Sequence, residues 1–335
     1  MLGSCSKEVG SGDEQEGYGN VTLNVRTGTM SRSGAEDGDE MNNLRIWLAD
    51  GEGEIRYCKF LTPDEGTNSE TVEFKDVKRG VYTLYVAANT TALDAYTEGQ
   101  TADADFTGKM LDTIKDGSAP DFSEGGMPLS VVKTISVGPG DNPISASLKR
   151  CAGKISITIR NSIGPGSAVF VAGVGLSRSN PSLGYLFPQP DGSIPAGAED
   201  TGFPELAEDE LYKVEYGSPV KVYETFLYET SVSEQDGRFT FNLFAAIYNS
   251  AVQPSEVKFN LVDGIRRFSG AEYEIPRGDR SISYIDKYGN SQTLKQISRN
   301  EHISIVVNIF YNRELGDFEY CIEGWEKKDN ETTFD

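Results

Sequence analysis

Apolar and polar residues alternate in one short run after another along this chain, and helical spacing is almost absent. The run VTLNVRT puts Val21, Leu23 and Val25 on one face and polar residues on the other. Such runs need a partner layer to bury their apolar face, and the 36 glycines and 14 prolines supply turns between them. The pattern predicts an all-β sandwich.

Further strands are expected along the whole chain. They are residues 44–50, 54–61, 71–77, 80–90, 145–160, 168–177, 221–230, 238–248, 256–262, 302–311 and 318–326. The first two of these form a hairpin whose register is set by Gly51 and Gly53. One short helix is expected within residues 92–114, because Phe106, Met110 and Ile114 are four residues apart, and it would cover a sheet edge.

The length of 335 residues favours two domains of ordinary size. The strongest internal breaker is GPGDNP, Gly138 to Pro143. We therefore expect an N-terminal linker over 1–20, one β-sandwich over 21–146 and a second over 147–335. The proline-rich residues 180–218 form either a surface excursion or a partner contact.

The net charge of −21, from 31 Lys and Arg against 52 Asp and Glu, predicts repulsion from phosphate backbones, so nucleic acid is not an expected partner. No run approaches the roughly 18 apolar residues of a membrane span. Any membrane attachment would therefore come from a covalent lipid.

The residues of known catalytic and metal sites are scarce. His302 is the one histidine, and no GxSxG turn supplies a nucleophile for it. The cysteine spacings match no metal or redox motif, so Cys58 and Cys151 are expected to be small buried hydrophobes. Trp47 and Trp325 lie in strand patterns and are expected to pack in the core or at an edge. We predict no enzyme activity, no metal and no cofactor.

The start of the chain, MLGSC, fits the site at which a lipoprotein signal peptidase cuts before a lipid-modified cysteine, here Cys5. The alternative is that the four residues match by chance. A leader also needs an apolar stretch of roughly 7–15 residues before the cut. Ahead of Cys5, Met1 and Leu2 are the only residues that could belong to such a stretch, so we expect that the apolar part of a leader is missing from this sequence.

Five stretches of the chain are informative together. They are residues 21–54, GGMPLS at 125–130, SLKRCAGKISITI at 147–159, VYETFLYET at 222–230 and SRNEHISIVVNI at 298–309. In their order and spacing they resemble the FimA-type fimbrillins, the subunits of type V pili of Bacteroidales, and the likeness spans nearly the whole chain. The resemblance implies two tandem transthyretin-like β-sandwich domains and a structural role in a cell-surface fimbrium that supports adhesion.

In that family a lipid carries the precursor to the outer membrane, and an arginine-specific protease then cuts the loop after the first strand. Residues 28–43, rich in Gly, Ser and acid, would be that exposed, mobile loop. By position, the resemblance implies a cut after Arg32 that leaves Ser33 as the new N-terminus. Arg26 is the competitor, but it lies within the strand pattern, where backbone pairing would protect it.

Loss of a strand carrying Val21, Leu23 and Val25 would open an apolar groove and two unpaired backbone edges. A strand from a neighbouring copy or a homologous pilin could refill the groove by β-augmentation, giving a head-to-tail polymer. The resemblance implies that the C-terminal segment is the donor. Its proposed contact residues are Phe318, Tyr320, Ile322 and Phe334, although Phe334 could equally belong to a frayed tail.

Two other roles stay open at this point. The chain could be a non-polymerising tip or anchor subunit of the same pilus, although Arg32 and the extended tail favour a polymerising subunit. It could also be a surface carbohydrate-binding lipoprotein whose aromatic residues in NPSLGYLFPQPDGS, residues 180–193, stack on sugar rings.

Overall fold

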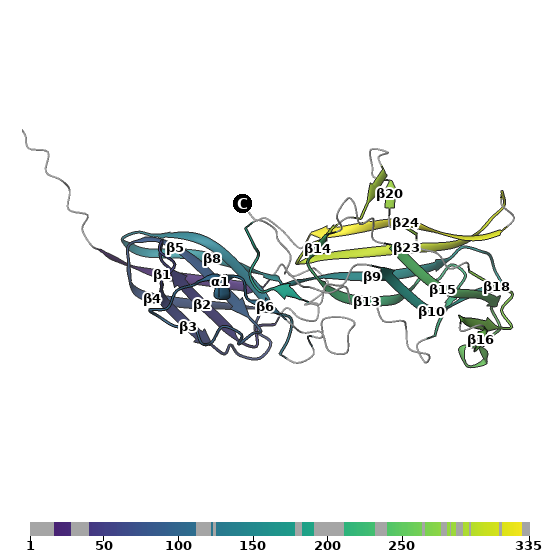
Figure 1. The fold of residues 1–335 in the computed structure, drawn as a ribbon, viewed down its shortest axis with the longest axis horizontal. Coiled ribbons are helices and arrows are strands. Elements are labelled where there is room, and N and C mark those ends of the chain that lie inside the picture. The colour runs from purple at the N-terminus through teal and green to yellow at the C-terminus, as the bar shows by residue number, and fades with distance from the viewer. Residues whose placement is uncertain are drawn as a thin grey trace, which may run out of the picture.

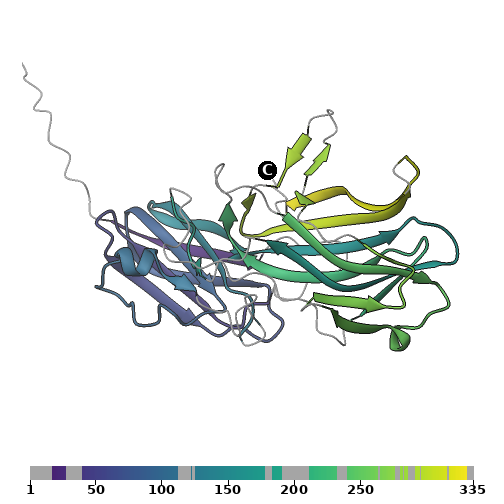
Figure 2. The ribbon, with the colours of Figure 1, turned by 45° about the vertical axis from the view of Figure 1, so that its right-hand side comes forward.

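The computed structural model describes residues 17–27, 40–111, 122, 125–177, 183–190, 211–231, 240–262, 265–275, 280–281, 283–285, 291–294, 296–314 and 317–329. Nearly all of the described elements are β-strands, which confirms the predicted all-β sandwich. In Figures 1 and 2 the purple and blue strands lie at one end of an elongated molecule and the green and yellow strands at the other, with teal strands running between them.

The expected helix over 92–114 is wrong for most of its length. α1 (Ala104–Thr107) is a single turn, which Asp103 caps by accepting from the backbone N–H of Asp105 and Phe106. Phe106 is fully buried, but Met110 lies in a strand and is 43% exposed. Ile114 lies outside the described residues. The other helix in the described part of the chain is the 3-10 turn η1 (Pro254–Glu256), and no described helix is long and apolar enough to cross a membrane.

The first half of the chain forms one seven-stranded sheet with the order β3-β2-β5-β7-β8-β1-β4. Its strands are β1 (Tyr18–Thr27), β2 (Leu44–Ala49), β3 (Ile55–Leu61), β4 (Ser69–Lys78), β5 (Gly80–Ala88), β7 (Leu129–Val137) and β8 (Gly140–Arg150). β7 and β8 pair only through Leu129 with Arg150 and Ser130 with Lys149. The sheet therefore divides there into a layer β4-β1-β8 and a layer β3-β2-β5-β7, which enclose one core.

The largest fully buried side chain of that N-terminal core is Trp47. The Trp47 indole N–H donates to the carbonyl of Tyr96 at 2.9 Å, and the ring meets Phe106 edge-on at 5.2 Å. The core also takes Leu186 and Phe187 from the middle of the chain, where β11 (Gly184–Tyr185) pairs with β6 (Met110–Leu111). This part of the segment 180–218 is therefore buried structure and not a surface excursion.

The second half forms two facing sheets. One has the order β13-β9-β23-β24 and the other β12-β10-β15-β18, with β19 also pairing with β15. Their strands are β9 (Ala152–Asn161), β10 (Ser167–Ser177), β12 (Tyr212–Glu215), β13 (Val220–Tyr228), β15 (Thr240–Asn249), β18 (Tyr273–Glu274), β19 (Arg280–Ser281), β23 (Glu301–Asn312) and β24 (Asp317–Asp329). A C-terminal core fills the space between them, with the alternating isoleucines of β9 and β23 fully buried in it.

Three small two-stranded sheets complete the described fold. They are β14 (Thr230–Ser231) with β22 (Gln296–Ile297), β16 (Lys258–Val262) with β17 (Ile265–Ser269), and β20 (Ser283–Ile285) with β21 (Ser291–Thr293). The β16–β17 hairpin contributes Phe268 to a separate aromatic cluster with Phe170 and Tyr248. The expected hairpin of residues 44–61 is present as β2 and β3, with Gly53 at φ 82° in its turn.

β8 and β9 follow each other across Cys151, so one extended stretch of chain serves both cores. The boundary predicted after residue 146 stays a prediction, as does the division into two domains. The N-terminal core includes Cys151, Ala152 and Tyr228, all of which follow that boundary.

Candidate functional site

β1 is the middle strand of the layer β4-β1-β8. It runs parallel to β8, with Gly19 opposite Gly140 and Thr27 opposite Leu148, and antiparallel to β4. Both of its backbone edges are therefore occupied. Removing β1 would leave a vacant slot between β4 and β8. It would free one edge of β8 and take away the one strand that pairs with β4 in the described part of the chain.

The side chains of β1 alternate between core and surface. Val21, Leu23 and Val25 are 1%, 0% and 1% exposed, and they share the face expected from the sequence. Burying a Val or Leu side chain is worth about 1.5–3 kcal/mol, so these three contribute several kcal/mol to stability. β1 thus fills a large part of the N-terminal core although it lies at the start of the described chain.

The connection between β1 and β2 begins and ends beside the same two residues, which precede β4. The backbone N–H of Thr27 donates to the Asn68 carbonyl at 2.9 Å, and that of Met41 donates to the Thr67 carbonyl at 2.8 Å. Thr67 and Asn68 are adjacent, so both ends of the connection are held against the start of β4. Residues 28–39 between them, including the predicted Arg32 and Ser33, lie outside the described residues.

The chain that follows this connection is fixed independently of β1 by Asn89. Asn89 is 7% exposed and has φ 59°, a left-handed conformation that asparagine tolerates. Its side-chain oxygen accepts from the backbone N–H of Asn42 at 2.8 Å, and its Nδ2 donates to the carbonyls of Glu40 and Met127 at 2.8 and 2.9 Å. These bonds tie the start of β2 to the GGMPLS segment, a role that the sequence did not reveal.

Arg26 lies inside β1. Its residue partners are Ser69 on β4 and Ser147 on β8, so its backbone lies between two paired strands. A protease binds its substrate as an extended chain with free backbone groups, and β1 offers none at this position.

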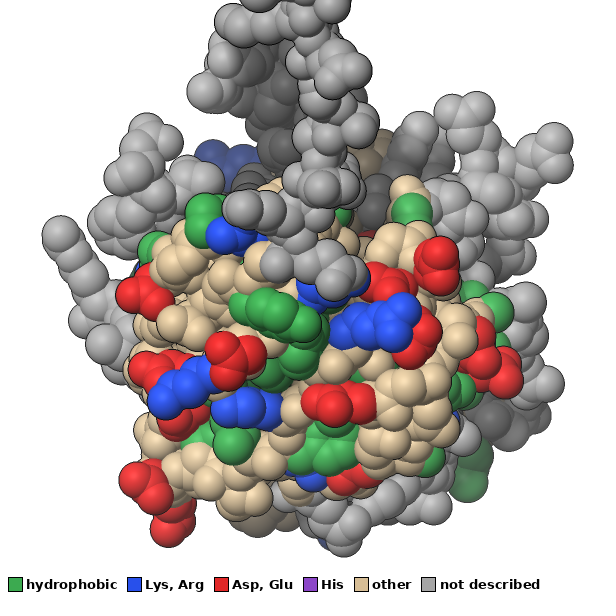
Figure 3. Space-filling model, turned by 90° about the vertical axis from the view of Figure 1, so that its left-hand side faces the viewer, with side chains coloured by type: hydrophobic (Ala, Val, Ile, Leu, Met, Phe, Trp, Pro, Cys, Tyr) green, Lys and Arg blue, Asp and Glu red, His purple; other side chains and the backbone are tan. Residues whose placement is uncertain are grey.

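β1 begins at one pole of the molecule. There Tyr18 and Val81 are 58% and 59% exposed. Figure 3 shows this end, with hydrophobic side chains lying among Lys, Arg, Asp and Glu. Cys5, the predicted lipidation site, lies outside the described residues.

The predicted donor segment is a strand at the end of a sheet order. β24 pairs along its length with β23, placing Phe318 opposite Tyr311, Tyr320 opposite Ile309 and Ile322 opposite Val307. In the described part of the chain, β23 is the one strand paired with β24. Phe334 lies outside the described residues.

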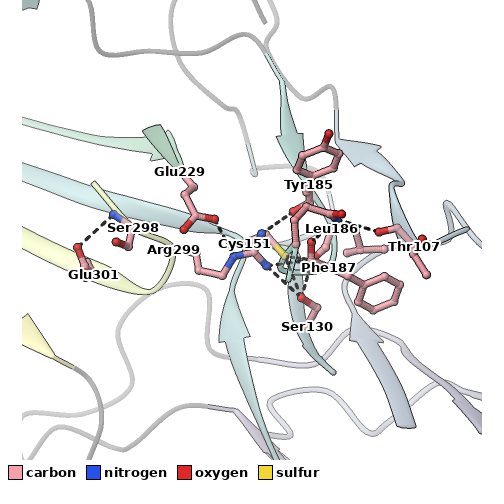
Figure 4. A network of polar contacts seen from close by, with 11 residues as sticks. Thr107, Ser130, Cys151, Tyr185, Leu186, Phe187, Glu229, Ser298, Arg299 and Glu301 are labelled. Atoms are coloured by element: carbon pink, nitrogen blue, oxygen red, sulfur yellow. Dashed lines mark hydrogen bonds and ion pairs between the residues drawn. The ribbon is translucent and has the colours of Figure 1, made fainter. Parts of the chain in front are cut away.

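A second cluster of polar contacts joins the two halves of the chain and is shown in Figure 4. The Arg299 side chain is 9% exposed. Its guanidinium donates to Glu229 at 3.3 Å, to the carbonyls of Tyr185 and Leu186 at 3.0 and 3.2 Å, and to Ser130 Oγ at 3.5 Å. It thus links β23's leading turn to the segment packed in the N-terminal core. We call these residues, with Cys151, the junction network.

Cys151 lies in the junction network. Its thiol is 1% exposed, and Sγ lies 3.2 Å from the Leu186 carbonyl and 3.6 Å from Ser130 Oγ. Burial raises the pKa of the Cys151 thiol, and the positive charge of Arg299 opposes part of that rise. It is a small buried side chain, as expected, whereas Cys58 on β3 is only half-buried.

No catalytic site was predicted from the sequence. In the structure, the imidazole of His302 contacts a serine side chain. His302 Nε2 lies 2.9 Å from Ser156 Oγ, across the parallel pair β9 and β23. Ser156 is 4% exposed in the middle of a regular strand, a position without the sharp turn that presents a nucleophile. Within the described residues, no cluster of His, Cys, Asp and Glu could hold a metal ion.

The aromatic residues proposed to stack on sugars are partly accounted for. Phe187 is 1% exposed and stacks on Phe106 at 5.6 Å in the N-terminal core. It therefore presents no face to a ligand. The described part of residues 180–193 contributes to packing and to the junction network.

No protein-family model matches the chain, and no curated protein sequence matches it. Solved structures do match its fold. A candidate cell adhesion protein of Parabacteroides distasonis is 15% identical and has a TM-score of 0.54 over 92% of this chain and 98% of the other.

Two fimbrial proteins of Porphyromonas gingivalis match similarly. The tip fimbrial protein Mfa3 is 15% identical, with a TM-score of 0.52 over 91% of this chain and 100% of the other. The fimbrilin FimA is 14% identical, with a TM-score of 0.52 over 92% of this chain and 97% of the other. The chain therefore shares its fold with fimbrial proteins of Bacteroidales, in agreement with the resemblance seen in the sequence.

Proposed function

We propose that this chain is a structural subunit of a cell-surface fimbria, exported to the outer membrane as a lipoprotein with its lipid on Cys5. The fold it shares with a fimbrilin and a tip fimbrial protein supports this role. The observation that carries the proposal is the position of β1, which fills the middle of a layer and is joined to β2 by a connection that leaves and returns beside Thr67 and Asn68. Such a strand can be detached by a single cut.

The cut follows Arg32 and leaves Ser33 as the mature N-terminus, and an arginine-specific protease makes it. Arg26 is the other arginine near this point, and its pairing with both β4 and β8 argues against it. After the cut, β1 is held by its ladders, its buried side chains and side-chain hydrogen bonds such as that of Asn20 to Asp141, with no covalent link to β2. The start of β2 keeps its bonds to Asn89 and stays in place.

Departure of β1 exposes the apolar groove and the edges of β4 and β8, and a neighbouring subunit then restores them. Its C-terminal segment, with Phe318, Tyr320 and Ile322 on one face and Phe334 beyond, enters the slot as a replacement strand. β24 suits this role because its described ladder lies on one side only, along β23. Repetition of the step gives a head-to-tail polymer that supports adhesion.

Arg32→Ala tests the processing step. In cells that assemble the fimbria, this variant should accumulate as full-length, lipidated monomer and form no high-mass ladders on gels run without boiling. Arg26→Ala is the matched control and should polymerise as the unaltered chain does. Mass spectrometry of surface-isolated polymer should find Ser33 at the N-terminus. Unchanged ladders from Arg32→Ala would show that the cut lies elsewhere.

A further inference from the structure

The slot that β1 occupies is closed to side chains at one position. A Cβ atom placed on Gly19 would overlap the carbonyl oxygen of Gly138 and come within 2.9 Å of both the Gly140 carbonyl oxygen and Asn142 Nδ2. Real Cβ atoms essentially never come closer than 3.0 Å to such atoms. Gly19 is therefore required by its surroundings and not by its own backbone conformation.

The atoms around Gly19 belong to a turn that is fixed by Asn142. The Asn142 side-chain oxygen accepts from the Gly138 N–H at 2.9 Å, and its Nδ2 lies 3.1, 3.0 and 3.0 Å from the carbonyls of Gly138, Gly140 and Asn20. Moving the turn to admit a methyl group would break several of these bonds. We call this position the closed end of the slot.

Gly17, two residues earlier, meets a different environment. A Cβ there would approach the guanidinium of Arg79, at the far end of a flexible side chain that can move aside. A strand displaced by two residues toward the pole would bring Val21 into the closed end, where it cannot fit. The closed end thus works with the apolar positions of Val21, Leu23 and Val25 to fix one register.

The geometry points to a register rule: a strand that replaces β1 must place a glycine at the closed end and apolar residues two, four and six positions further on. The rule rests on the proposed function, because it concerns the strand that refills the slot. We infer that the occupant is residues 316–324 of a second copy, in the direction of β1. Gly316 then takes the place of Gly19, and Phe318, Tyr320 and Ile322 take the places of Val21, Leu23 and Val25.

Other stretches of the chain also have a glycine followed by alternating apolar residues, but they are held in place. β5 starts at Gly80 and lies between β2 and β7, and β9 contains Gly153 and lies between β13 and β23. β24, which covers most of the inferred occupant, is at the end of its sheet order. It can leave one ladder without splitting a sheet.

Phe318 and Tyr320 are larger than Val21 and Leu23, so the two layers must move apart to accept them. Such overpacking is unfavourable, but the side chains of an apolar core can relieve part of it by repacking. The closed end cannot adapt in the same way, since backbone carbonyls surround it. Glycine at this position is therefore the most selective feature of the occupant.

Gly316→Ala and Gly324→Ala, each made in the full chain, test the rule and its direction together. Gly324 would lie at the place of Thr27, where a side chain is already accepted, so Gly324→Ala should form ladders like the unaltered chain. Gly316→Ala should lose them. If the unaltered chain forms no ladders, the proposed function fails. If both variants polymerise normally, the register rule is wrong while the proposed function stands, and if only Gly324→Ala fails, the occupant runs in the opposite direction.

Peptide binding separates docking from any effect of Gly316→Ala on the fold of the donor. Labelled peptides of residues 17–27 and 315–324 are titrated under reducing conditions into chain that has been cut in the 28–39 connection and freed of β1. Each alanine peptide, Gly19→Ala or Gly316→Ala, should bind at least about tenfold more weakly than its parent. Gly17→Ala is the control and should bind like its parent. Equal binding by parent and alanine peptides would show that the closed end does not exclude a side chain.

Discussion

At the scale of single residues, three apolar side chains account for the contribution of β1 to the N-terminal core. Val21, Leu23 and Val25 are at most 1% exposed, whereas Arg26 on the same strand points to solvent. A buried leucine makes contacts on all sides, and truncating it loses both the transfer free energy and the packing around the cavity. The stability of the N-terminal core should therefore depend on this strand residue by residue.

Leu23→Ala should lower the free energy of unfolding of the N-terminal core by about 3 kcal/mol. The measurement is urea unfolding followed by Trp47 fluorescence in a Trp325→Phe background, because Trp47 lies in that core. Arg26→Ala is the control and should change the free energy by less than about 0.5 kcal/mol. A Leu23→Ala effect as small as that of the control would mean that β1 is not part of the stable core.

At the scale of elements, the alternation of apolar and polar residues predicted which segments form strands. It did not predict which segments distant in sequence pack together. The hairpin of β2 and β3 and the buried face of β1 follow from local patterns. The helix failed because three apolar residues four apart, Phe106, Met110 and Ile114, are too few to define a face, and Gly108 follows α1 directly as its C-cap. Nothing local shows that Leu186 and Phe187 return to the N-terminal core.

The junction network could not be predicted from the sequence, for a related reason. The motif containing Arg299 was recognised, but two of its acceptors are the backbone carbonyls of Tyr185 and Leu186. Every residue has such a carbonyl, so no side-chain pattern marks it. The same holds for Gly19, whose neighbours at the closed end are backbone atoms of a turn remote in sequence.

The inferred occupant differs from β1 in charge at three positions, with Asp317, Glu319 and Glu323 in place of Asn20, Thr22 and Arg26. Asn20 donates to the Asp141 carboxylate at 3.0 Å, and Asp317 would take its place in the inferred register. Two carboxylates would then face each other on the exposed side of the slot, which is unfavourable by about 0.2–1 kcal/mol.

The Asp317→Asn form of peptide 315–324 should therefore bind the emptied slot about two- to threefold more tightly than its parent at low salt. The gain should shrink as added salt screens the pair. Glu323→Gln is the matched control, because it removes one charge on the same exposed face at the place of Arg26, whose partners Ser69 and Ser147 are uncharged. An equal gain from both variants would indicate a general charge effect and not a contact with Asp141.

At the scale of the whole molecule, two cores are joined by a continuous stretch of chain and by side-chain contacts across it. β8 and β9 supply the chain, and Arg299 reaches from the C-terminal half to Ser130 and Leu186. A buried guanidinium needs all of its acceptors, and those acceptors in turn need it. Loss of Arg299 should therefore loosen this junction rather than either core.

The rate at which the Cys151 thiol is alkylated reports how tightly the junction is packed. Its thiol is buried, and burial raises its pKa, so both access and thiolate content limit its reaction with alkylating reagents. In the native unaltered chain, Cys151 should resist iodoacetamide while half-buried Cys58 reacts faster. Arg299→Ala removes the charge that holds the pKa of Cys151 down, which lowers its thiolate content, but it also opens access to the thiol. Because access is the stronger limit for a buried thiol, the labelling rate of Cys151 should rise about tenfold or more and that of Cys58 should stay unchanged, as measured by mass spectrometry of proteolytic peptides over time.

Arg299→Lys separates charge from geometry. Lysine keeps the positive charge but cannot present several donors in one plane, so it cannot reach Glu229, Tyr185 and Leu186 together. It should fall between the unaltered chain and Arg299→Ala in the rate of Cys151 labelling. A rate in Arg299→Ala equal to that of the unaltered chain would show that the covalent link through β8 and β9, with the packing of Leu186 and Phe187, closes the junction without the arginine.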